Sequence, residues 1–275
     1  MALPFKAVAV DVDGTFVNDD KKYDHEWFER ILDRLDQENI HFIIASGRPY
    51  ERLRGDFRDF ADRIDFVANN GAMIVNHGEA SIIKEFPRPV VLNLIYQISL
   101  KYPKAKRSIV VSGVKHSYIL KEMPPAMKEI IYYFYPRTLE LDDFTQLPDD
   151  TYIKLTLSFK NSIRQQLEKE FNATTSYQIH ATTSGWEDID ITRQGVNKAA
   201  ALAQLLQQFD AGLPDLIAFG DGNNDLEMLR AAGISYAMEN GQEIVKQTAK
   251  FIAPSNNDNG VFKTLEAYLD GKKDA

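Results

Sequence analysis

The sequence of 275 residues contains no cysteine. This absence excludes disulfide bonds, thiolate metal ligands and a cysteine nucleophile. Its 15 glycines and 11 prolines are too few for a low-complexity or collagen-like chain. With 44% hydrophobic and 26% charged residues, the composition is typical of a globular protein. The length allows one large domain or two ordinary ones.

Positive charge is also in deficit, since 32 Lys and Arg residues face 40 Asp and Glu residues and the formal net charge is −8. Nucleic-acid binding needs clustered lysines and arginines, so we expect no nucleic-acid partner. No apolar run approaches the roughly 20 residues of a membrane span. Residues 1–10 also lack the pattern of a signal peptide. We therefore expect a cytoplasmic protein with no membrane association, either a monomer or a homodimer.

Short apolar runs and amphipathic stretches alternate near both ends of the chain, which predicts a parallel sheet with crossover helices. The helices are expected at 24–37, 50–60 and around 199–206. The runs of strand length lie at 5–10, 41–45, 65–68, 216–219, 234–238 and 251–253. Such an α/β arrangement is a Rossmann-like, doubly wound fold.

The middle of the chain has a different pattern, with hairpin-like strands and separate helices that are typical of an α+β domain. The strands are expected at 108–112, 117–121, 152–159, 177–182 and 187–191, and the helices at 125–135 and 162–171. We predict an α/β core formed by residues 1–82 and 188–275, with an α+β domain inserted at 83–187.

Two acidic loops directly follow predicted strands. Asp11 and Asp13 come after the first strand, and Gly14 lets the chain bend so that both carboxylates turn to one side. The carboxyl ends of parallel strands are where such sheets bind ligands. In the second loop, Gly220–Asp225, the side chains of Asp221, Asn224 and Asp225 offer the hard oxygen ligands that suit Mg²⁺. Taken singly, the first loop also fits a solvated turn and the second a capped helix N-terminus.

Two further segments carry groups suited to phosphate. Ser46-Gly47-Arg48 follows the second predicted strand and combines a hydroxyl with main-chain N–H groups. Lys198 stands in the first turn of a predicted helix, where its charge opposes the helix dipole. Each alone also fits an ordinary strand-to-helix turn or a surface lysine. Together, the four segments supply the charges that phosphoryl transfer requires.

These motifs resemble those of the haloacid dehalogenase-like phosphatases, specifically the Cof-type group with an α+β cap of type II, subclass B. The segment Asn69-Asn70-Gly71-Ala72 is also typical of this group. The resemblance extends over essentially the whole chain and identifies the inserted domain as the cap. It implies a Mg²⁺-dependent phosphatase that acts on a small phosphorylated metabolite through an aspartyl-phosphate.

The resemblance also implies a role for each residue. Asp11 is the nucleophile, and Asp13 is the general acid and base. Ser46 and Lys198 complete the catalytic set by holding the phosphoryl oxygens. The implied metal ligands are Asp11, the carbonyl of Asp13, Asp221, Asn224 and Asp225. The implied substrate contacts are Ser46, Gly47, Arg48, Asn70, Gly71, Lys198 and Asn224.

Several alternatives stay open at this point. A sugar phosphomutase shares this core and cap, and a non-catalytic sensor of a phosphorylated metabolite would retain the same pocket. A sugar phosphate is the favoured substrate, with flavin mononucleotide, pyridoxal phosphate and nucleotides as alternatives. Late in the cap, His180, Thr183, Trp186 and Glu187 are candidates for substrate contact, although a surface loop explains them equally well.

Overall fold

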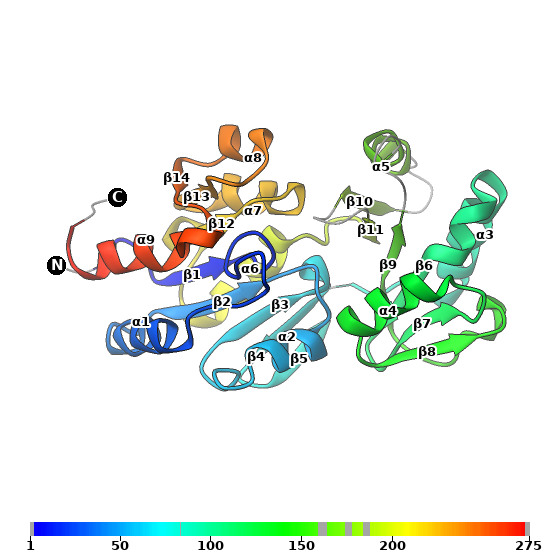
Figure 1. Ribbon diagram of the computed structural model, residues 1–275, viewed down its shortest axis with the longest axis horizontal. Coiled ribbons are helices and arrows are strands. Elements are labelled where there is room, and N and C mark those ends of the chain that lie inside the picture. The colour runs from blue at the N-terminus through cyan, green and yellow to red at the C-terminus, as the bar shows by residue number, and fades with distance from the viewer. Residues whose placement is uncertain (1–2, 83, 159–163, 174–177, 184–187, 273–275) are drawn as a thin grey trace.

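The computed structural model describes residues 3–82, 84–158, 164–173, 178–183 and 188–272. Its described strands form an eight-stranded sheet and a six-stranded sheet, which occupy opposite halves of Figure 1. The strands of the eight-stranded sheet are β1 (Ala7–Val10), β2 (His41–Ala45), β3 (Asp65–Ala68), β4 (Met73–Asn76), β5 (Glu79–Ile82), β12 (Leu216–Gly220), β13 (Ile234–Met238) and β14 (Phe251–Ala253). Those of the six-stranded sheet are β6 (Ile109–Gly113), β7 (Ser117–Leu120), β8 (Thr138–Leu141), β9 (Tyr152–Ser158), β10 (Ile179–Thr183) and β11 (Asp188–Arg193).

The eight-stranded sheet has the order β14-β13-β12-β1-β2-β3-β4-β5. Neighbouring strands are parallel from β14 to β3, and β4 and β5 extend the sheet as an antiparallel hairpin. The helices are α1 (His25–Gln37), α2 (Tyr50–Asp56), α3 (Arg88–Lys101), α4 (Pro125–Phe134), α5 (Arg164–Ala173), α6 (Lys198–Leu206), α7 (Leu226–Ala231), α8 (Glu243–Thr248) and α9 (Gly260–Leu269). The predicted α/β core is thereby confirmed, and both chain ends lie at its side away from the second sheet (Figure 1).

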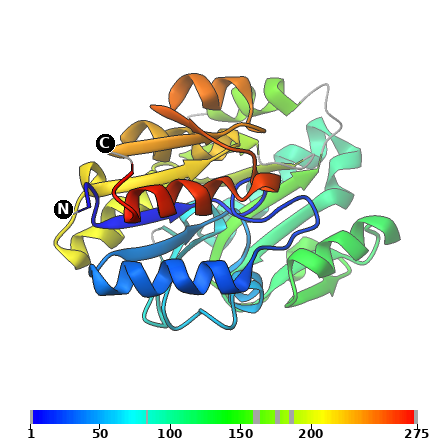
Figure 2. The same ribbon diagram turned by 60° about the vertical axis from the view of Figure 1, so that its left-hand side comes forward.

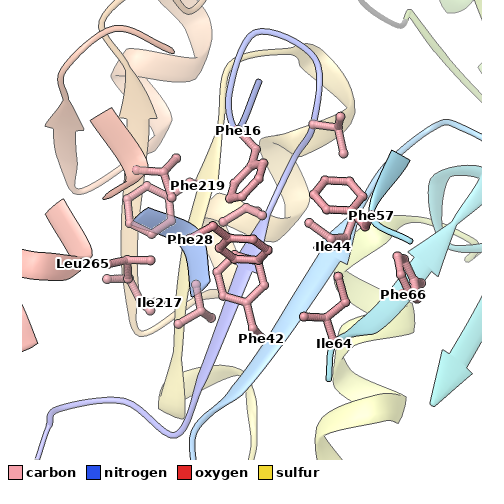
Figure 3. Close-up of a cluster of buried hydrophobic side chains, with 14 of the residues drawn as sticks. Phe16, Phe28, Phe42, Ile44, Phe57, Ile64, Phe66, Ile217, Phe219 and Leu265 are labelled. Carbon is pink, nitrogen blue, oxygen red and sulfur yellow. The ribbon is translucent and has the colours of Figure 1, made fainter. Parts of the chain in front are cut away.

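Helices cover both faces of the eight-stranded sheet, because successive strand residues point to opposite sides. Helices α1 and α9 lie together on one face (Figure 2), and α6 and α7 pack on the other. An aromatic cluster fills the first face (Figure 3). The centroid of the Phe16 ring lies 4.9 Å from the ring centroid of Phe28 and 5.5 Å from that of Phe57. Phe16 follows the first acidic loop, so this burial anchors the loop to the core.

The six-stranded sheet has the order β10-β11-β9-β6-β7-β8 and confirms an α+β cap. Helix α3 and Leu167 of α5 pack on one of its faces. On the other face α4 covers Val110 and Ile119. The remainder of that face carries a row of alternating polar residues turned toward the eight-stranded sheet. That row includes Lys154, Thr156, Asp190 and Thr192.

Most predicted elements agree with the structure within a few residues, but two differences stand out. The inserted sheet runs to Arg193 in β11, six residues beyond the predicted boundary at 187, because β11 pairs with β9. Helix α3 has no predicted counterpart, since apolar residues occur around most of its circumference and Tyr96 and Leu100 stay exposed. Because β11 belongs to the inserted sheet, we move the second predicted boundary from 187 to about 194, and the domain limits stay a prediction.

Among the helices that the structure describes, none combines the length and the apolar character that a membrane span needs.

Candidate active site

The side chains of Asp11 and Lys198 meet at the carboxyl edge of the eight-stranded sheet. Asp11 directly follows β1, and its main-chain N–H donates to the carbonyl of Phe219 in β12. Lys198 begins α6, and its Nζ lies 2.6 Å from Asp11 Oδ1 and 2.6 Å from Asp225 Oδ1. Both lysine contacts are buried. The two carboxylates explain how a lysine is tolerated at a helix N-terminus.

Asp11, Asp221 and Asp225 form an acidic cluster in which one oxygen from each lies within 4.8 Å of the others. Asp225 has no exposed surface, and its Oδ2 accepts hydrogen bonds from the main-chain N–H groups of Asp221 and Gly222, both at 3.0 Å. Thr15 Oγ1 donates to Asp221 Oδ1 at 2.9 Å. Asp225 therefore holds the loop and Lys198 in place, while Asp11 and Asp221 retain more free oxygen lone pairs.

Burial shifts the pKa values of Asp11 and Asp221 in this cluster. It raises the pKa of Asp11 to about 7, although the charge of Lys198 acts in the opposite direction. Burial and the negative charge of Asp11 raise the pKa of Asp221 to about 8. Burial lowers the pKa of Lys198, but the charges of Asp11 and Asp225 outweigh it and raise that pKa overall. A cation bound between Asp11 and Asp221 would favour their ionised forms.

Asp13 faces cations instead. Arg48 Nε and Nη2 donate to its two carboxylate oxygens at 2.7 and 2.6 Å, and Lys21 Nζ lies 2.8 Å from Oδ1. Burial raises the pKa of Asp13, but hydrogen bonds and charge from Arg48 and Lys21 outweigh it and lower the pKa overall. Arg48 also contacts Asp56 at 2.5 Å. Arg48, predicted as a substrate contact, is thus occupied by two carboxylates in this arrangement.

Gly14 and Gly71 occupy positions near the site where a side chain would not fit. Gly14 has φ of +77°, and a Cβ there would lie 2.5 Å from Asp221 Oδ2. Gly71, another predicted substrate contact, has φ of +93° and would place a Cβ 2.2 Å from the carbonyl oxygen of Asn197. Its contact is therefore with the start of α6, where the absence of a side chain permits close packing.

The Ser46–Arg48 turn and the Asn69–Gly71 segment are hydrogen bonded to each other. The N–H of Asn70 donates to the carbonyl of Ser46 at 3.0 Å, and that of Asn69 to the carbonyl of Arg48 at 2.9 Å. Ser46 is buried, and its Oγ accepts from the Arg48 N–H at 3.2 Å. Asn224 Nδ2 donates to Asn70 Oδ1 at 3.0 Å, which links this turn to the second acidic loop.

A pocket between the two sheets contains most of the predicted site. Its lining from the eight-stranded sheet and adjoining loops includes Asp11, Asp13, Ser46, Gly47, Arg48, Asp221 and Asn224. Its opposite wall combines an apolar face of α4 with polar residues of β9 and β11. This wall comprises Ile130, Ile131, Phe134, Tyr135, Lys154, Thr156, Asp188 and Asp190.

The residues of this opposite wall have no counterpart among the predicted site residues. The available signal was a charge in each of two apolar strands, Lys154 between Ile153 and Leu155, and Asp190 between Ile189 and Ile191. The cap residues that were predicted behave differently. His180 Nε2 lies 3.9 Å from Glu227, and Thr183 Oγ1 accepts from Asn223. Trp186 and Glu187 lie outside the described residues.

The family model of the haloacid dehalogenase-like hydrolases matches residues 8–265, which is most of the chain. The chain belongs to this family. The resemblance drawn from the four motifs is confirmed, and this haloacid dehalogenase-like hydrolase is a phosphoric monoester hydrolase. Its family generally uses a divalent metal, and the buried aspartate cluster can hold one.

Named relatives support the same assignment. The hydrolase is 33% identical over 267 residues to the 5-amino-6-(5-phospho-D-ribitylamino)uracil phosphatase YbjI of Escherichia coli (strain K12), covering 97% of each chain. It resembles the crystal structure of SMU.1108c from Streptococcus mutans UA159 with a TM-score of 0.92 and 37% identity, covering 97% of this chain and 99% of that one. The HAD subclass IIB sugar phosphatase BT4131 shares the fold, with a TM-score of 0.80, 22% identity and coverage of 96% and 98%.

Proposed function

We propose that this hydrolase is a Mg²⁺-dependent phosphatase that acts on small phosphate monoesters through an aspartyl-phosphate on Asp11. The contact of Asp11 with Lys198 and the neighbouring acidic cluster supports this most directly. A carboxylate with a buried ammonium group at 2.6 Å is held in one orientation, as in-line attack on phosphorus requires.

The donor set fits Mg²⁺, which prefers hard oxygen ligands. Asp11, Asp221 and the main-chain carbonyl of Asp13 would hold the ion, with Asn224 and Asp225 in or near its shell. Bound there, Mg²⁺ would offset the repulsion between a carboxylate nucleophile and an anionic ester. The raised pKa values of Asp11 and Asp221 agree with a site that is incomplete without a cation.

The chain's own residues account for the remaining steps. An oxygen of Asp11 forms a bond to phosphorus while the bond from phosphorus to the ester oxygen breaks. Asp13 donates a proton to that leaving oxygen and later takes one from the water that hydrolyses the intermediate. Its ionised form beside Arg48 and Lys21 suits the second step, so the first requires Arg48 to release Asp13. Ser46 and Lys198 would hold the phosphoryl oxygens.

The opposite wall of the pocket would contact the leaving group of the substrate. Its apolar part includes Phe134 and Tyr135, and its polar part includes Lys154, Thr156 and Asp190. A sugar or polyol phosphate suits the polar part, and a ring attached to it would lie against the aromatic part. The ribitylaminouracil phosphate for which the relative from Escherichia coli is named combines both features, which makes it the first compound to test.

The cytoplasmic location, and a monomeric or homodimeric state, stay predictions.

The decisive experiment measures phosphate release from sugar phosphates, the ribitylaminouracil phosphate, nucleotides, flavin mononucleotide and pyridoxal phosphate, with Mg²⁺ and with EDTA. We expect release from a few related esters that EDTA abolishes and Mg²⁺ restores. Asp11→Asn should abolish turnover while leaving the fold intact, because the side chain keeps its size. Metal-independent release would contradict the proposed coordination, and an active Asp11→Asn variant would remove Asp11 as the nucleophile.

A further inference from the structure

A buried ion pair of the cap lies in the wall opposite Asp11. Lys154 on β9 and Asp190 on β11 are 1% and 3% exposed, and Lys154 Nζ lies 3.2 Å from Asp190 Oδ1. Thr156 Oγ1 donates to the same oxygen at 2.6 Å. Burying two charges costs desolvation energy that the pair itself often fails to recover. The contacts that the pair makes outside the cap therefore indicate what it does.

Both members of the pair reach the loops of the eight-stranded sheet. Lys154 Nζ donates to the main-chain carbonyl of Gly47 at 2.8 Å. Asp190 Oδ2 accepts from Asn70 Nδ2 at 2.7 Å. Gly47 belongs to the Ser46–Arg48 turn, which lines the pocket, and Asn70 belongs to the segment that is hydrogen bonded to that turn. The pair thus connects the inserted sheet directly to the Ser46–Arg48 turn.

The contact at Gly47 has a consequence for its neighbours. The Gly47 carbonyl and the Arg48 N–H belong to one planar trans peptide unit, so they point in opposite directions. Lys154 holds the carbonyl on one side, and the N–H on the other side donates to Ser46 Oγ at 3.2 Å. Because the Ser46 oxygen accepts this bond, its single proton remains available for another acceptor. Among the residues that the structure describes, no hydrogen bond is donated by this hydroxyl.

We propose that Lys154 is a positioning residue that orients the Ser46 hydroxyl toward the phosphoryl group through the Gly47–Arg48 peptide. The cap then contributes to phosphate binding as well as to the leaving-group wall. The role of Lys154 rests on the proposed function, because an oriented Ser46 hydroxyl matters only if a phosphoryl group binds beside Asp11. Lys154 has no contact with substrate in this role and acts only through the turn.

A double-mutant cycle tests the role of Lys154. The value of kcat/KM for p-nitrophenyl phosphate with Mg²⁺ is measured for the wild type, Lys154→Met, Ser46→Ala and the double variant. This small aryl ester has no sugar or polyol part, so it reports chiefly on the phosphoryl side of the pocket. We expect Lys154→Met to lower kcat/KM by about 10- to 100-fold, the range found when a residue that orients an active-site group is removed. In the Ser46→Ala background the same change should cost less than about twofold, because the two residues act as one unit.

Three controls keep the outcome interpretable. Lys154→Arg keeps a donor at the same position and should recover part of the loss. Lys121→Met removes an exposed cap lysine, paired with Asp142, and should leave kcat/KM unchanged. Since Lys154→Met leaves the Asp190 carboxylate unpaired, the cycle is repeated in an Asp190→Asn background, and the melting temperature of every variant is recorded.

The possible results separate the two proposals. Non-additive losses support the positioning role. Equal losses from Lys154→Met with and without the Ser46 hydroxyl would overturn it, since Lys154 would then act on the leaving group or on cap closure. An unchanged kcat/KM in a folded Lys154→Met variant would overturn it as well. A wild-type protein with no metal-dependent phosphatase activity would instead reject the proposed function.

Discussion

At the scale of single residues, opposite environments separate the two aspartates of the first loop. Asp11 is buried beside other carboxylates, and its pKa rises to about 7. Asp13, two positions later, is bound by Arg48 and Lys21, and its pKa falls. The same side-chain type therefore provides two different proton affinities within one loop. In the proposed mechanism a bound cation would favour the ionised form of Asp11 for attack, and Asp13 would donate its proton only after Arg48 releases it.

The raised pKa values lead to a prediction about metal-free protein. In the folded state the pKa values of Asp11 and Asp221 are about 7 and about 8. In the unfolded chain each would have its ordinary value of 3.8, so both residues bind protons more tightly when the protein is folded. The folded state is therefore favoured at low pH, and this contribution is lost as the pH rises from about 4 to about 8. In EDTA the melting temperature should fall over this range, and Mg²⁺ should reduce the fall.

Thermal unfolding at pH 5, 6.5 and 8, with EDTA and with Mg²⁺, checks this dependence. Asp11→Asn is the matched variant, because it removes one titrating group and also the charge that raises the pKa of Asp221. Its melting temperature in EDTA should vary less with pH than that of the wild type. A wild-type melting temperature in EDTA that rises steadily from pH 5 to pH 8 would contradict the assigned shifts.

Among individual residues, local spacing identified Asp11, Asp13, Ser46, Lys198 and Asp221, because each lies next to a strand or helix end. It did not identify Lys154 or Asp190. Both lie inside strands whose burial on two sides depends on the packing of the cap against the core. Their charges are visible in the sequence, but a charge in a strand more often marks a solvent-exposed position.

At the scale of elements, the start of α6 carries much of the site. Asn197 caps the helix by accepting from the Ala200 N–H at 2.8 Å. The next residue, Lys198, has its charge balanced by Asp11 and Asp225. The N-cap at Asn197 and the two ion pairs together determine where the Lys198 ammonium group lies. An unsatisfied helix end here would affect both stability and the site.

Asn197→Ala should therefore lower the free energy of unfolding by about 1 kcal/mol, the typical cost of losing an N-cap side chain. Asn197→Ser is the matched control, because serine caps helices about as well as asparagine. Urea denaturation of the three proteins measures the difference. Equal stability of the alanine variant and the wild type would mean that Asn197 does not stabilise the helix.

Element patterns were predictable where the period was clear. The helix over 24–37 shows its apolar residues on one stripe, and α1 buries Phe28, Ile31, Leu32 and Leu35 from that stripe. Helix α3 also buries one stripe, formed by Val91, Leu94, Ile95 and Ile98, but further apolar residues such as Tyr96 and Leu100 lie outside it and obscure the period in the sequence. The hairpin β4–β5 was also unpredicted, because two four-residue strands around a short turn give little periodic signal.

At the level of the whole molecule, two sheets meet at the pocket, each with its own hydrophobic clusters, and Ile153 of β9 joins a cluster of the eight-stranded sheet. Two clusters lie on the two faces of the eight-stranded sheet, between its strands and the helices α1, α9, α6 and α7. A third cluster lies between α3 and the strands of the six-stranded sheet. Polar contacts cross the pocket, such as those of Lys154 with Gly47 and of Asp190 with Asn70. We therefore expect the two parts to lose structure in separate steps.

Leu155→Ala tests this expectation. Leu155 has no exposed surface on the central cap strand β9, and its truncation should destabilise the cap by about 2–5 kcal/mol. Amide hydrogen exchange, followed by mass spectrometry, should show lost protection in β6–β11 with little change in the eight-stranded sheet. Leu216→Ala, equally buried on β12, is the matched control and should give the reverse pattern. Equal loss in both sheets would indicate one cooperative unit.

Local sequence patterns were enough to predict the family, the α/β core with its α+β insertion, and the four motifs at the strand and helix ends. These features depend on local periodicity and on short spacings, which neighbouring residues specify. Which side chains contact one another became known only from the folded arrangement of the chain. Lys198 contacts Asp11 across 187 positions, and Lys154 reaches Gly47 across 107. Such contacts follow from strand register and from the packing of distant segments, and local patterns do not encode that packing.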